Sequence, residues 1–408
     1  MESILSAKSK YVYNPISEED QLAEKLKKKG KEIISLSAGD PAKYFETPKY
    51  FIDAYIRALK EGKTSYALGA GVKELRQAIA NRYRRLYKLN ADPEDVIVTQ
   101  GVSEAIDFLN AIMINAPEKA ILFRPYYPLY PLYLRENGGV PLFEEYYEHL
   151  GWNIDPEKLE KTIKKEARKR PKYMLITNPN NPTGTVFDRK VLEEIVDLAN
   201  NYDILLVSDE IYDEIVFNNA KFTSIAKLAK GMPYIIMNGA SKAFDATGFR
   251  LGYVIIPEHD SKSKAIRQAF VNYAQARLSA NVPAQYAFAE ALENEKEHEK
   301  NVKRMVKEIE KRANFATQLL NETPNMHAVE PNSAFYVFPK LNKDLLSIKD
   351  DKEFVIRLLN EEGIQVTRGS AFGSPDHIRV VALAPKDILS KAINKINEFC
   401  ERHKRKEA

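Results

Sequence analysis

Short apolar runs, each ending in a polar or glycine-containing turn, recur along much of the chain. Charged, amphipathic stretches of helical length separate them. Strands that alternate with helices in this way favour a mostly parallel β-sheet with helices on its faces. The apolar runs lie at residues 96–98, 120–123, 173–177, 204–207 and 234–237. The chain is therefore expected to be an α/β protein.

The C-terminal part of the chain has a different pattern. Short strand-like runs over 334–338, 364–367 and 377–382 lie between helical patterns over 351–362 and 386–403, which predicts a smaller α+β domain. At 408 residues the chain also exceeds an ordinary single domain. The expected division is an N-terminal segment of residues 1–45 that joins the small domain, a large α/β domain of 46–290, and a small α+β domain of 291–408.

Composition argues against several functional classes. The formal net charge is only +4, with basic and acidic residues mixed along the chain, so neither nucleic acid nor a membrane surface is an expected partner. One cysteine, Cys400, and six scattered histidines give no disulfide framework and no metal-ligand spacing. The sequence has no apolar run of membrane-spanning length, and its first residues lack a signal-like apolar core. A cytoplasmic protein without a bound metal is expected.

The apolar run 234–237 leads to the most informative candidate residue, Lys242. In open α/β sheets, ligands bind outside the carboxyl ends of the strands. A lysine at that edge can form a Schiff base with a carbonyl compound. Arg250 follows eight residues later, after a glycine-containing loop, and can hold a phosphate group. The alternative is that Lys242 is one more surface lysine.

Other strand ends carry further candidates. Asp209 follows the apolar run 204–207 after a single serine. A buried carboxylate there needs a cationic partner, for which Lys242 or a bound cationic ring are the candidates. Gly101, Val102 and Ser103 follow a strand and open a helix. That arrangement binds anions through free N–H groups, or it simply caps the helix.

Four more positions have both a functional and a structural interpretation. Tyr127 follows the run 120–123 and can stack on a planar ligand or pack in the core. Asn181 lies in a heptad rich in turn formers, residues 178–184. Gly39 lies in a turn where the backbone can approach a ligand closely, and Arg379 lies between apolar neighbours in a strand. Taken alone, each position also has an interpretation as an ordinary turn, core or surface residue, although a plain turn explains the two Asn-Pro pairs of the heptad only awkwardly.

In combination these motifs resemble the class I/II aminotransferases of fold type I, which use pyridoxal 5′-phosphate, and most closely their alanine aminotransferase-like members. The resemblance extends from Gly39 to Arg379. It is carried by NPNNPTG at 178–184, SDEIY at 208–212, SK followed by Arg250, Y-x4-G-x3-LR at 66–76, and the late Arg379. It implies the fold-type I architecture, a mostly parallel seven-stranded sheet flanked by helices, and a transaminase activity.

The resemblance also implies roles for individual residues. Lys242 would carry the cofactor as a Schiff base and then move the substrate's α-proton, while Asp209 would keep the pyridine nitrogen protonated. Tyr212 and Asn181 would hydrogen-bond the phenolic oxygen, and Tyr127 would stack on the ring. The other implied contacts are to the phosphate (Gly101, Val102, Ser103, Ser241, Arg250 and, from a neighbouring subunit, Tyr66) and to the substrate α-carboxylate (Gly39, Asn181, Arg379). A homodimer with shared active sites is thereby implied.

The implied reaction is a ping-pong exchange in which an L-amino acid gives its amino group to a 2-oxo acid, 2-oxoglutarate being favoured. Alanine is the favoured donor, with aspartate or aromatic amino acids as other possibilities. A dicarboxylate-specific enzyme would need a second cation, for which Arg277 is a candidate. A lyase or decarboxylase on the same fold is the alternative, because fold and cofactor do not fix which bond at Cα breaks.

The sequence departs from the family at two positions. Gly239 stands where many relatives carry a serine three residues before the lysine, so that phosphate contact is either absent or made by Ser241. Arg368-Gly369 replaces a Pro-Gly that relatives often show. An exposed position is favoured for Arg368, with an approach to the substrate as the alternative.

Overall fold

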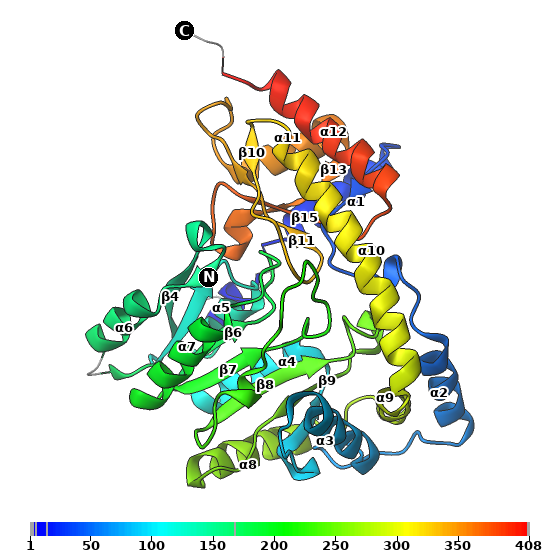
Figure 1. Ribbon diagram of the computed structural model, residues 1–408, viewed down its shortest axis with the longest axis vertical. Helices are drawn as coiled ribbons and strands as arrows, with labels where there is room; N and C mark the ends of the chain where they lie inside the picture. Colours follow the sequence, from blue (N-terminus) through cyan, green and yellow to red (C-terminus); the bar gives the residue numbers. More distant parts are fainter. Residues whose placement is uncertain (1–3, 5, 14, 167–168, 406–408) are drawn as a thin grey trace.

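The computed structural model of the protein describes residues 4, 6–13, 15–166 and 169–405 (Figure 1). The expected N-terminal segment 1–45 and the expected domain 291–408 therefore each extend beyond the described residues at one end. The expectation that the first residues lack a signal-like apolar core also concerns residues that lie partly outside the described ranges. No helix within the described ranges is long and apolar enough to cross a membrane.

Within the described residues, eight strands form the main sheet, in the order β2-β9-β8-β7-β6-β3-β4-β5. Strand β9 runs antiparallel to β2 and β8, β5 runs antiparallel to β4, and the other neighbours are parallel. The bounds are β2 (Val96–Thr99), β3 (Lys119–Arg124), β4 (Val140–Tyr147), β5 (Asn153–Ile154), β6 (Tyr173–Thr177), β7 (Leu205–Asp209), β8 (Tyr234–Gly239) and β9 (Gly252–Ile255). The expected mostly parallel α/β fold is confirmed, with the two-residue β5 as a strand beyond the expected seven.

Strand β9 is not among the elements expected from the sequence. The chain leaves β8, forms the loop that carries Lys242 and Arg250, and returns as β9, so that Gly239 pairs with Gly252. A side chain at position 252 would place its Cβ 2.5 Å from the Gly101 carbonyl carbon. This close approach brings the start of α4 beside the lysine loop.

Helices cover both faces of the sheet, because successive residues of a strand point to opposite sides. Ile235 and Met237 of β8 belong to the core shared with α4, α5 and α8. Tyr234 and Ile236 belong to the core shared with α3, α6, α7 and α9. These helices are α3 (Lys73–Tyr87), α4 (Gly101–Met113), α5 (Leu129–Glu136), α6 (Pro156–Lys165), α7 (Arg189–Asn201), α8 (Ser261–Ala276) and α9 (Val282–Glu293).

The rest of the chain builds a second region with its own hydrophobic core. The long helix α10 (Glu295–Asn321) leads from α9 into it and packs against α12 (Lys386–Arg402) (Figure 1). Strand β1 (Ile34–Ser35) pairs in parallel with β13 (Ile364–Gln365), which joins the N-terminal segment to this region. Its other elements are α1 (Ser17–Lys28), α11 (Asp351–Glu362), β10 (Met326–His327), β11 (Tyr336–Val337), β12 (Lys340–Leu341), β14 (Thr367–Arg368) and β15 (Ile378–Val381). Helix α2 (Lys49–Lys60) packs against α9.

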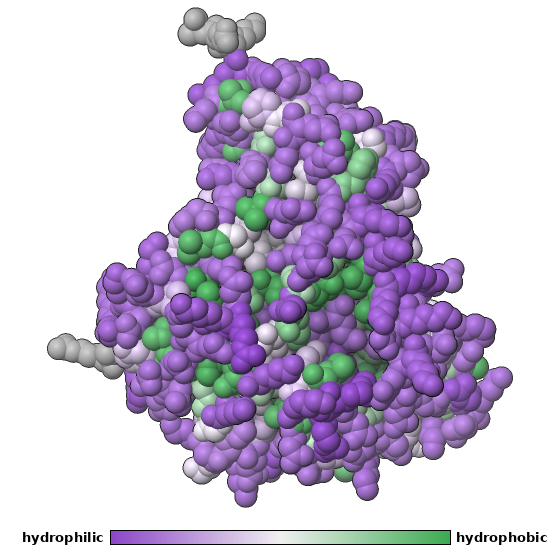
Figure 2. Space-filling view, in the orientation of Figure 1, coloured by the Kyte–Doolittle hydropathy of each residue, from purple (hydrophilic) through white to green (hydrophobic). Residues whose placement is uncertain are grey.

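The face shown in Figure 2 is mostly hydrophilic, with hydrophobic patches between the polar side chains.

The register of the strands aligns their ends at one edge of the sheet. Thr177 at the end of β6 pairs with Asp209 at the end of β7, and Asp209 pairs with Met237 of β8. The carboxyl ends of these strands therefore meet at one edge of the sheet, where ligands bind in folds of this kind.

Candidate active site

A cavity of about 410 Å³ lies at this edge, between the main sheet and the C-terminal region. Residues from the strand ends, from the starts of α4 and α5, from the N-terminal segment and from β11 and β15 line it. All but two of the site residues expected from the sequence are among them: Gly39, Val102, Ser103, Tyr127, Asn181, Asp209, Tyr212, Ser241, Lys242, Arg250 and Arg379. The structure thus brings together residues that are separated by up to 340 positions in the chain.

The amino group of Lys242 lies inside this cavity. Lys242 follows β8 by three residues, and its Nζ donates a hydrogen bond to the carbonyl oxygen of Gly39 at 2.7 Å. Burial is the main cause that lowers the pKa of Lys242 to about 8; the repulsion of Arg379 acts in the same direction, and the attraction of Asp40 opposes both. A lysine whose pKa lies near neutrality has a substantial uncharged fraction, which is the form that attacks a carbonyl or accepts a proton.

Asp209 lies at the end of β7 with its side chain buried. Its Oδ2 accepts a hydrogen bond from the hydroxyl of Tyr130 at 2.7 Å, and its Oδ1 accepts one from the backbone N–H of Ile211 at 3.2 Å. Burial raises the pKa of Asp209 to about 6, although the bond from Tyr130 lowers it. Of the two expected cationic partners, Lys242 lowers the pKa of Asp209 through its charge, but its hydrogen bond goes to Gly39. A bound cationic group would still be stabilised by this carboxylate.

The start of α4 forms a cradle with Arg250. Gly101 has φ +73°, and an added Cβ there would lie 2.5 Å from the Arg250 guanidinium. Because only glycine keeps this space open, the backbone at the helix start and the arginine lie side by side. The N-terminus of a 13-residue helix, the hydroxyls of Ser103 and Ser241 and a guanidinium together suit a phosphate dianion.

Arg379 lies on β15 with its guanidinium between the rings of Tyr336 and Phe372, each 4.7 Å from the ring centroid. It donates hydrogen bonds to Asn181 Oδ1 at 3.0 Å and to the carbonyl oxygen of Ser37 at 2.6 Å. Its Nε is buried without a hydrogen-bond partner in the described part of the chain. A bound carboxylate would supply the acceptor and the negative charge that this buried cation lacks.

The structure assigns other positions to four residues singled out by the sequence. Gly101 lies beneath the cavity, against Arg250, and Tyr66 lies outside it with its side chain 84% exposed. Arg277 donates to the carbonyl oxygens of Gly69 and Val98, so within this chain it is not a cation of the cavity. The favoured exposed position of Arg368 is wrong: its side chain is buried against α1.

The structure adds cavity residues that the sequence argument did not single out. Tyr130, in the first turn of α5, donates a hydrogen bond to Asp209, and its place three residues after Tyr127 was the available signal. The Tyr336 hydroxyl lies 2.8 Å from the Tyr212 hydroxyl, but no motif marked this position. Ile16 and Asp20 reach the cavity from a helix far away in sequence. Their contribution depends on tertiary packing alone.

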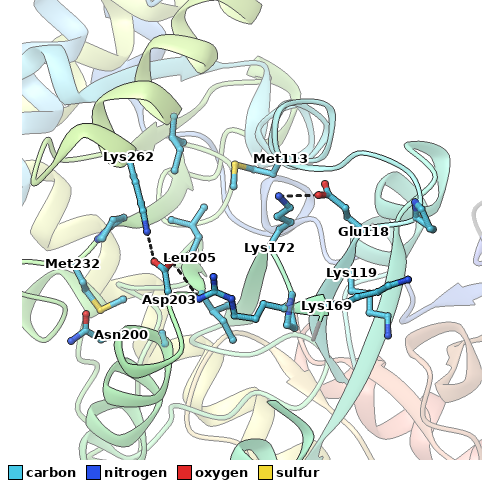
Figure 3. A pocket seen from close by; sticks show the side chains of 17 residues that line it. Met113, Glu118, Lys119, Lys169, Lys172, Asn200, Asp203, Leu205, Met232 and Lys262 are labelled. Carbon is cyan, nitrogen blue, oxygen red and sulfur yellow. Dashed lines mark hydrogen bonds and ion pairs between the residues drawn. The ribbon is translucent and has the colours of Figure 1, made fainter. Parts of the chain in front are cut away.

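A larger cavity, about 620 Å³, lies at the opposite edge of the sheet, where β3, β6, β7 and β8 begin (Figure 3). Its charged groups mostly neutralise one another. Lys262 pairs with Asp203 at 2.5 Å, and Lys172 pairs with Glu118 at 2.9 Å. Unlike the cavity around Lys242, it is lined by no buried lysine and no buried carboxylate in the described part of the chain. The smaller cavity is therefore the candidate active site.

Comparison with known proteins identifies the family. Residues 31–396 match the family of class I and II aminotransferases, and the chain belongs to that family. It is 33% identical over 386 residues to the aspartate aminotransferase of Bacillus subtilis, covering 93% of this chain and 94% of that protein. It is 34% identical to the alanine aminotransferase of Mycobacterium tuberculosis over 93% of this chain and 88% of that protein.

Two solved structures support the same assignment. The alanine aminotransferase of Pyrococcus furiosus superposes with a TM-score of 0.93 at 34% identity, over 98% of this chain and all of that one. The Thermus thermophilus aspartate aminotransferase with maleate superposes with a TM-score of 0.89 at 32% identity, over the same shares of the two chains. The protein is an aminotransferase of fold type I.

The raised pKa of Asp209 predicts how the stability of the ligand-free protein depends on pH. Unfolded aspartate ionises near 3.9, so the unfolded state loses this proton first and the stability falls as the pH rises from about 4 to about 6. Asp209→Asn should remove this loss and raise the free energy of unfolding above pH 6 by ~3 kcal/mol. Denaturant unfolding of both proteins across this pH range measures the difference.

Asp53→Asn provides the matched control. Asp53 is a partly exposed aspartate on α2 that pairs with Lys49, and its replacement should change the unfolding free energy little at any pH. A difference between Asp209→Asn and the original protein that stays constant from pH 4 to pH 7 would contradict the electrostatic description of Asp209.

Proposed function

We propose that the protein binds pyridoxal 5′-phosphate and moves an amino group from an L-amino acid to a 2-oxo acid by a ping-pong mechanism. L-Alanine is the favoured donor and 2-oxoglutarate the favoured acceptor, with aspartate and aromatic amino acids as further donors. The observation that carries the proposal is the convergence of Lys242, Asp209, Arg250 and Arg379 on one cavity. Relatives named alanine and aspartate aminotransferase support the choice of donors.

The residues around the cavity fit this cofactor. The helix start at Gly101, Val102 and Ser103, with Ser241 and Arg250, would hold its phosphate. Tyr127 would stack on its ring, and Asn181 and Tyr212 would donate hydrogen bonds to its phenolic oxygen. When bound, the cofactor supplies an electron sink that stabilises negative charge at the substrate Cα.

Asp209 would keep the cofactor's ring nitrogen protonated. Its carboxylate is destabilised by burial, so a cationic N–H at hydrogen-bond distance stabilises the ionised form. Tyr130 fixes the orientation of the carboxylate through the 2.7 Å hydrogen bond to Oδ2. The ionised carboxylate and the protonated ring nitrogen therefore stabilise each other.

Lys242 would carry the cofactor and then move a proton at the substrate Cα. With a pKa of about 8, its amino group exchanges protons readily near neutral pH. Arg379 would bind the substrate α-carboxylate, with Asn181 and the backbone at Gly39 beside it. The rings of Tyr336 and Phe372 keep the guanidinium in place and exclude water from it.

We further propose that the enzyme is a cytoplasmic homodimer whose active sites are shared. Tyr66, Leu68 and Leu278 are exposed apolar side chains, and Arg277 ties their two segments together through the carbonyl oxygen of Gly69. Exposed apolar residues that gather on neighbouring segments are typical of interfaces. Tyr66 would contact the phosphate in the neighbouring subunit.

We also propose that the chain divides into a large domain of residues 46–290 and a smaller domain of residues 1–45 with 291–408. The pairing of β1 with β13 and the separate hydrophobic core support this division.

The absorbance of the purified protein tests the proposed reaction. Loaded with the cofactor, the enzyme should be yellow, and L-alanine without an oxo acid should convert the cofactor to its aminated form and release pyruvate. Lys242→Ala should keep its far-ultraviolet circular dichroism but lose more than ~10⁴-fold in turnover. Near-normal turnover in that variant would overturn the role of Lys242. Release of carbon dioxide from alanine would indicate a decarboxylase, and release of ammonia together with a 2-oxo acid from an amino acid that has a leaving group at Cβ would indicate a β-lyase.

The role of Arg379 predicts a defect in amino-acid binding. Arg379→Ala removes a charge-assisted pair with the substrate carboxylate, worth about 2–3 kcal/mol, so half-saturation by alanine should need roughly 30- to 150-fold more amino acid. Titration of the cofactor absorbance with alanine measures this value. Cofactor content should be unchanged, and the exposed Arg84→Ala should behave like the original protein. An unchanged half-saturation in Arg379→Ala would remove this residue from the substrate site.

Hybrid dimers test whether the active sites are shared. Lys242→Ala and Tyr66→Ala protomers, dissociated and reassembled together, should recover activity, because one site of each mixed dimer then has both original residues. Lys242→Ala mixed with Arg250→Ala should recover none, since both replaced residues belong to the same protomer's cavity. Equal behaviour of the two mixtures would contradict a contribution of Tyr66 to the neighbouring subunit.

A further inference from the structure

Arg368 forms a buried cluster between β14 and the start of α1. Its Nη1 donates to Glu19 Oε1 at 2.5 Å and to Glu18 Oε2 at 3.1 Å, and its Nη2 donates to the carbonyl oxygen of Pro15 at 2.7 Å. The side chains of Arg368 and Glu19 are 7% and 0% exposed. One guanidinium thus holds both the backbone before α1 and the first turn of the helix.

The same helix start contributes to the substrate cavity. Ile16 and Asp20 line the cavity, on either side of the buried Glu19. The Oδ1 atom of Asp20 also accepts a hydrogen bond from the Gln365 side chain at 2.7 Å. Ile16 and Asp20 form one wall of the cavity. The position and orientation of this wall therefore depend on contacts between α1 and the β13–β14 segment.

Arg368 also follows directly in sequence a residue that supports the side of the cavity where Arg379 lies. Its neighbour Thr367 pairs with Arg379 across β14 and β15. The hydroxyl of Thr367 lies 2.8 Å from the hydroxyl of Ser37, whose carbonyl oxygen accepts from Arg379. Two adjacent residues of one strand thus support two walls of the cavity.

We propose that Arg368 is a positioning residue of the substrate site, which docks the start of α1 and so places Ile16 and Asp20 opposite Arg379. This inference rests on the proposed aminotransferase function. Ile16 supplies an apolar surface for the substrate side chain, and Asp20 places a negative charge at the same wall. Uncharged side chains such as that of alanine are favoured there over a second carboxylate.

The physical basis is the burial of Glu19. A buried ion pair contributes little net stability, but removal of one partner leaves a charge without compensation. Without the guanidinium, the Glu19 carboxylate regains solvation only if the start of α1 moves away from β14. The wall formed by Ile16 and Asp20 then moves with it, although neither residue has been changed.

Arg368→Met tests this inference in the ligand-free protein and in the loaded enzyme. In the ligand-free protein, amide hydrogen exchange over residues 15–28 should increase at least ~10-fold, while exchange in α4 and β7 stays unchanged. In the loaded enzyme, KM for L-alanine should rise about 10-fold with kcat within about 2-fold, and the ratio of kcat/KM for L-alanine over L-aspartate should fall.

Two further variants separate docking from a general loss of stability. Arg368→Met with Glu19→Leu removes both charges, so protection of residues 15–28 and KM should return toward the original values. Arg357→Met is the matched control, because Arg357 forms partly exposed ion pairs with Glu353 and Glu361 on α11, and it should change neither quantity. Should Arg368→Met fail to fold, Asp20→Asn tests the charge directly. This variant should lower the ratio of kcat/KM for L-alanine over L-aspartate.

The possible outcomes are distinct. Unchanged exchange over residues 15–28 in Arg368→Met would overturn the docking role, and increased exchange with an unchanged KM and substrate ratio would overturn the link to the substrate site. A failure of the proposed function would be recognised differently, because the original protein itself would then show no transamination while the exchange difference would still be measurable.

Discussion

The active site depends on the register of three neighbouring parallel strands. Because Thr177 pairs with Asp209 and Asp209 pairs with Met237, β6, β7 and β8 end at the same edge of the sheet. Asp209 is the last residue of β7, and Lys242 follows β8 by three residues. The hydrogen-bond ladder therefore fixes their relative position with little freedom. A slip of one residue would turn Asp209 to the opposite face of the sheet and separate the two groups.

Burial at this edge brings both groups closer to their neutral forms. The pKa of Lys242 is lowered to about 8 and the pKa of Asp209 is raised to about 6, with loss of solvation as the main cause in each case. Their mutual attraction is too weak to reverse either effect, and their hydrogen bonds go to other partners. In the proposed function, a ligand with a cationic ring nitrogen would supply the partner that Asp209 lacks and would leave the chemistry to Lys242. In the described part of the chain, the Asp209 carboxylate accepts hydrogen bonds from Tyr130 and Ile211 but forms no ion pair.

The sequence was sufficient to predict those parts of the site that lie close to strand ends. Lys242, Asp209 and Ser103 each follow an apolar run, so their place at the sheet edge could be inferred before the fold was known. Tyr130 and Tyr336 could not be assigned, because their roles depend on which hydroxyl or carboxylate lies opposite them in space. Strand β9 was missed since it is a four-residue return of the chain after a functional loop.

Arg368 shows most clearly which contacts a local sequence pattern cannot predict. In a strand next to glycine, an arginine has no partner within its own segment, so an exposed position was the reasonable expectation. Its carboxylate partners are about 350 residues away, at the opposite end of the sequence. Such a pair can be predicted only when the pairing of β1 with β13 is already known, because that pairing brings the two ends of the chain together.

The N-terminal segment, which these contacts hold in place, also connects the part of the site around Lys242 with the part around Arg379. The carbonyl oxygen of Gly39 accepts from Lys242, and the carbonyl oxygen of Ser37 accepts from Arg379. Since both acceptors are backbone atoms, most side-chain changes along this segment would leave the connection intact. Gly39 is the exception, because a Cβ there would lie 2.3 Å from the Tyr336 hydroxyl, which in turn contacts Tyr212. The segment can therefore lie between the lysine and the arginine only because residue 39 has no side chain.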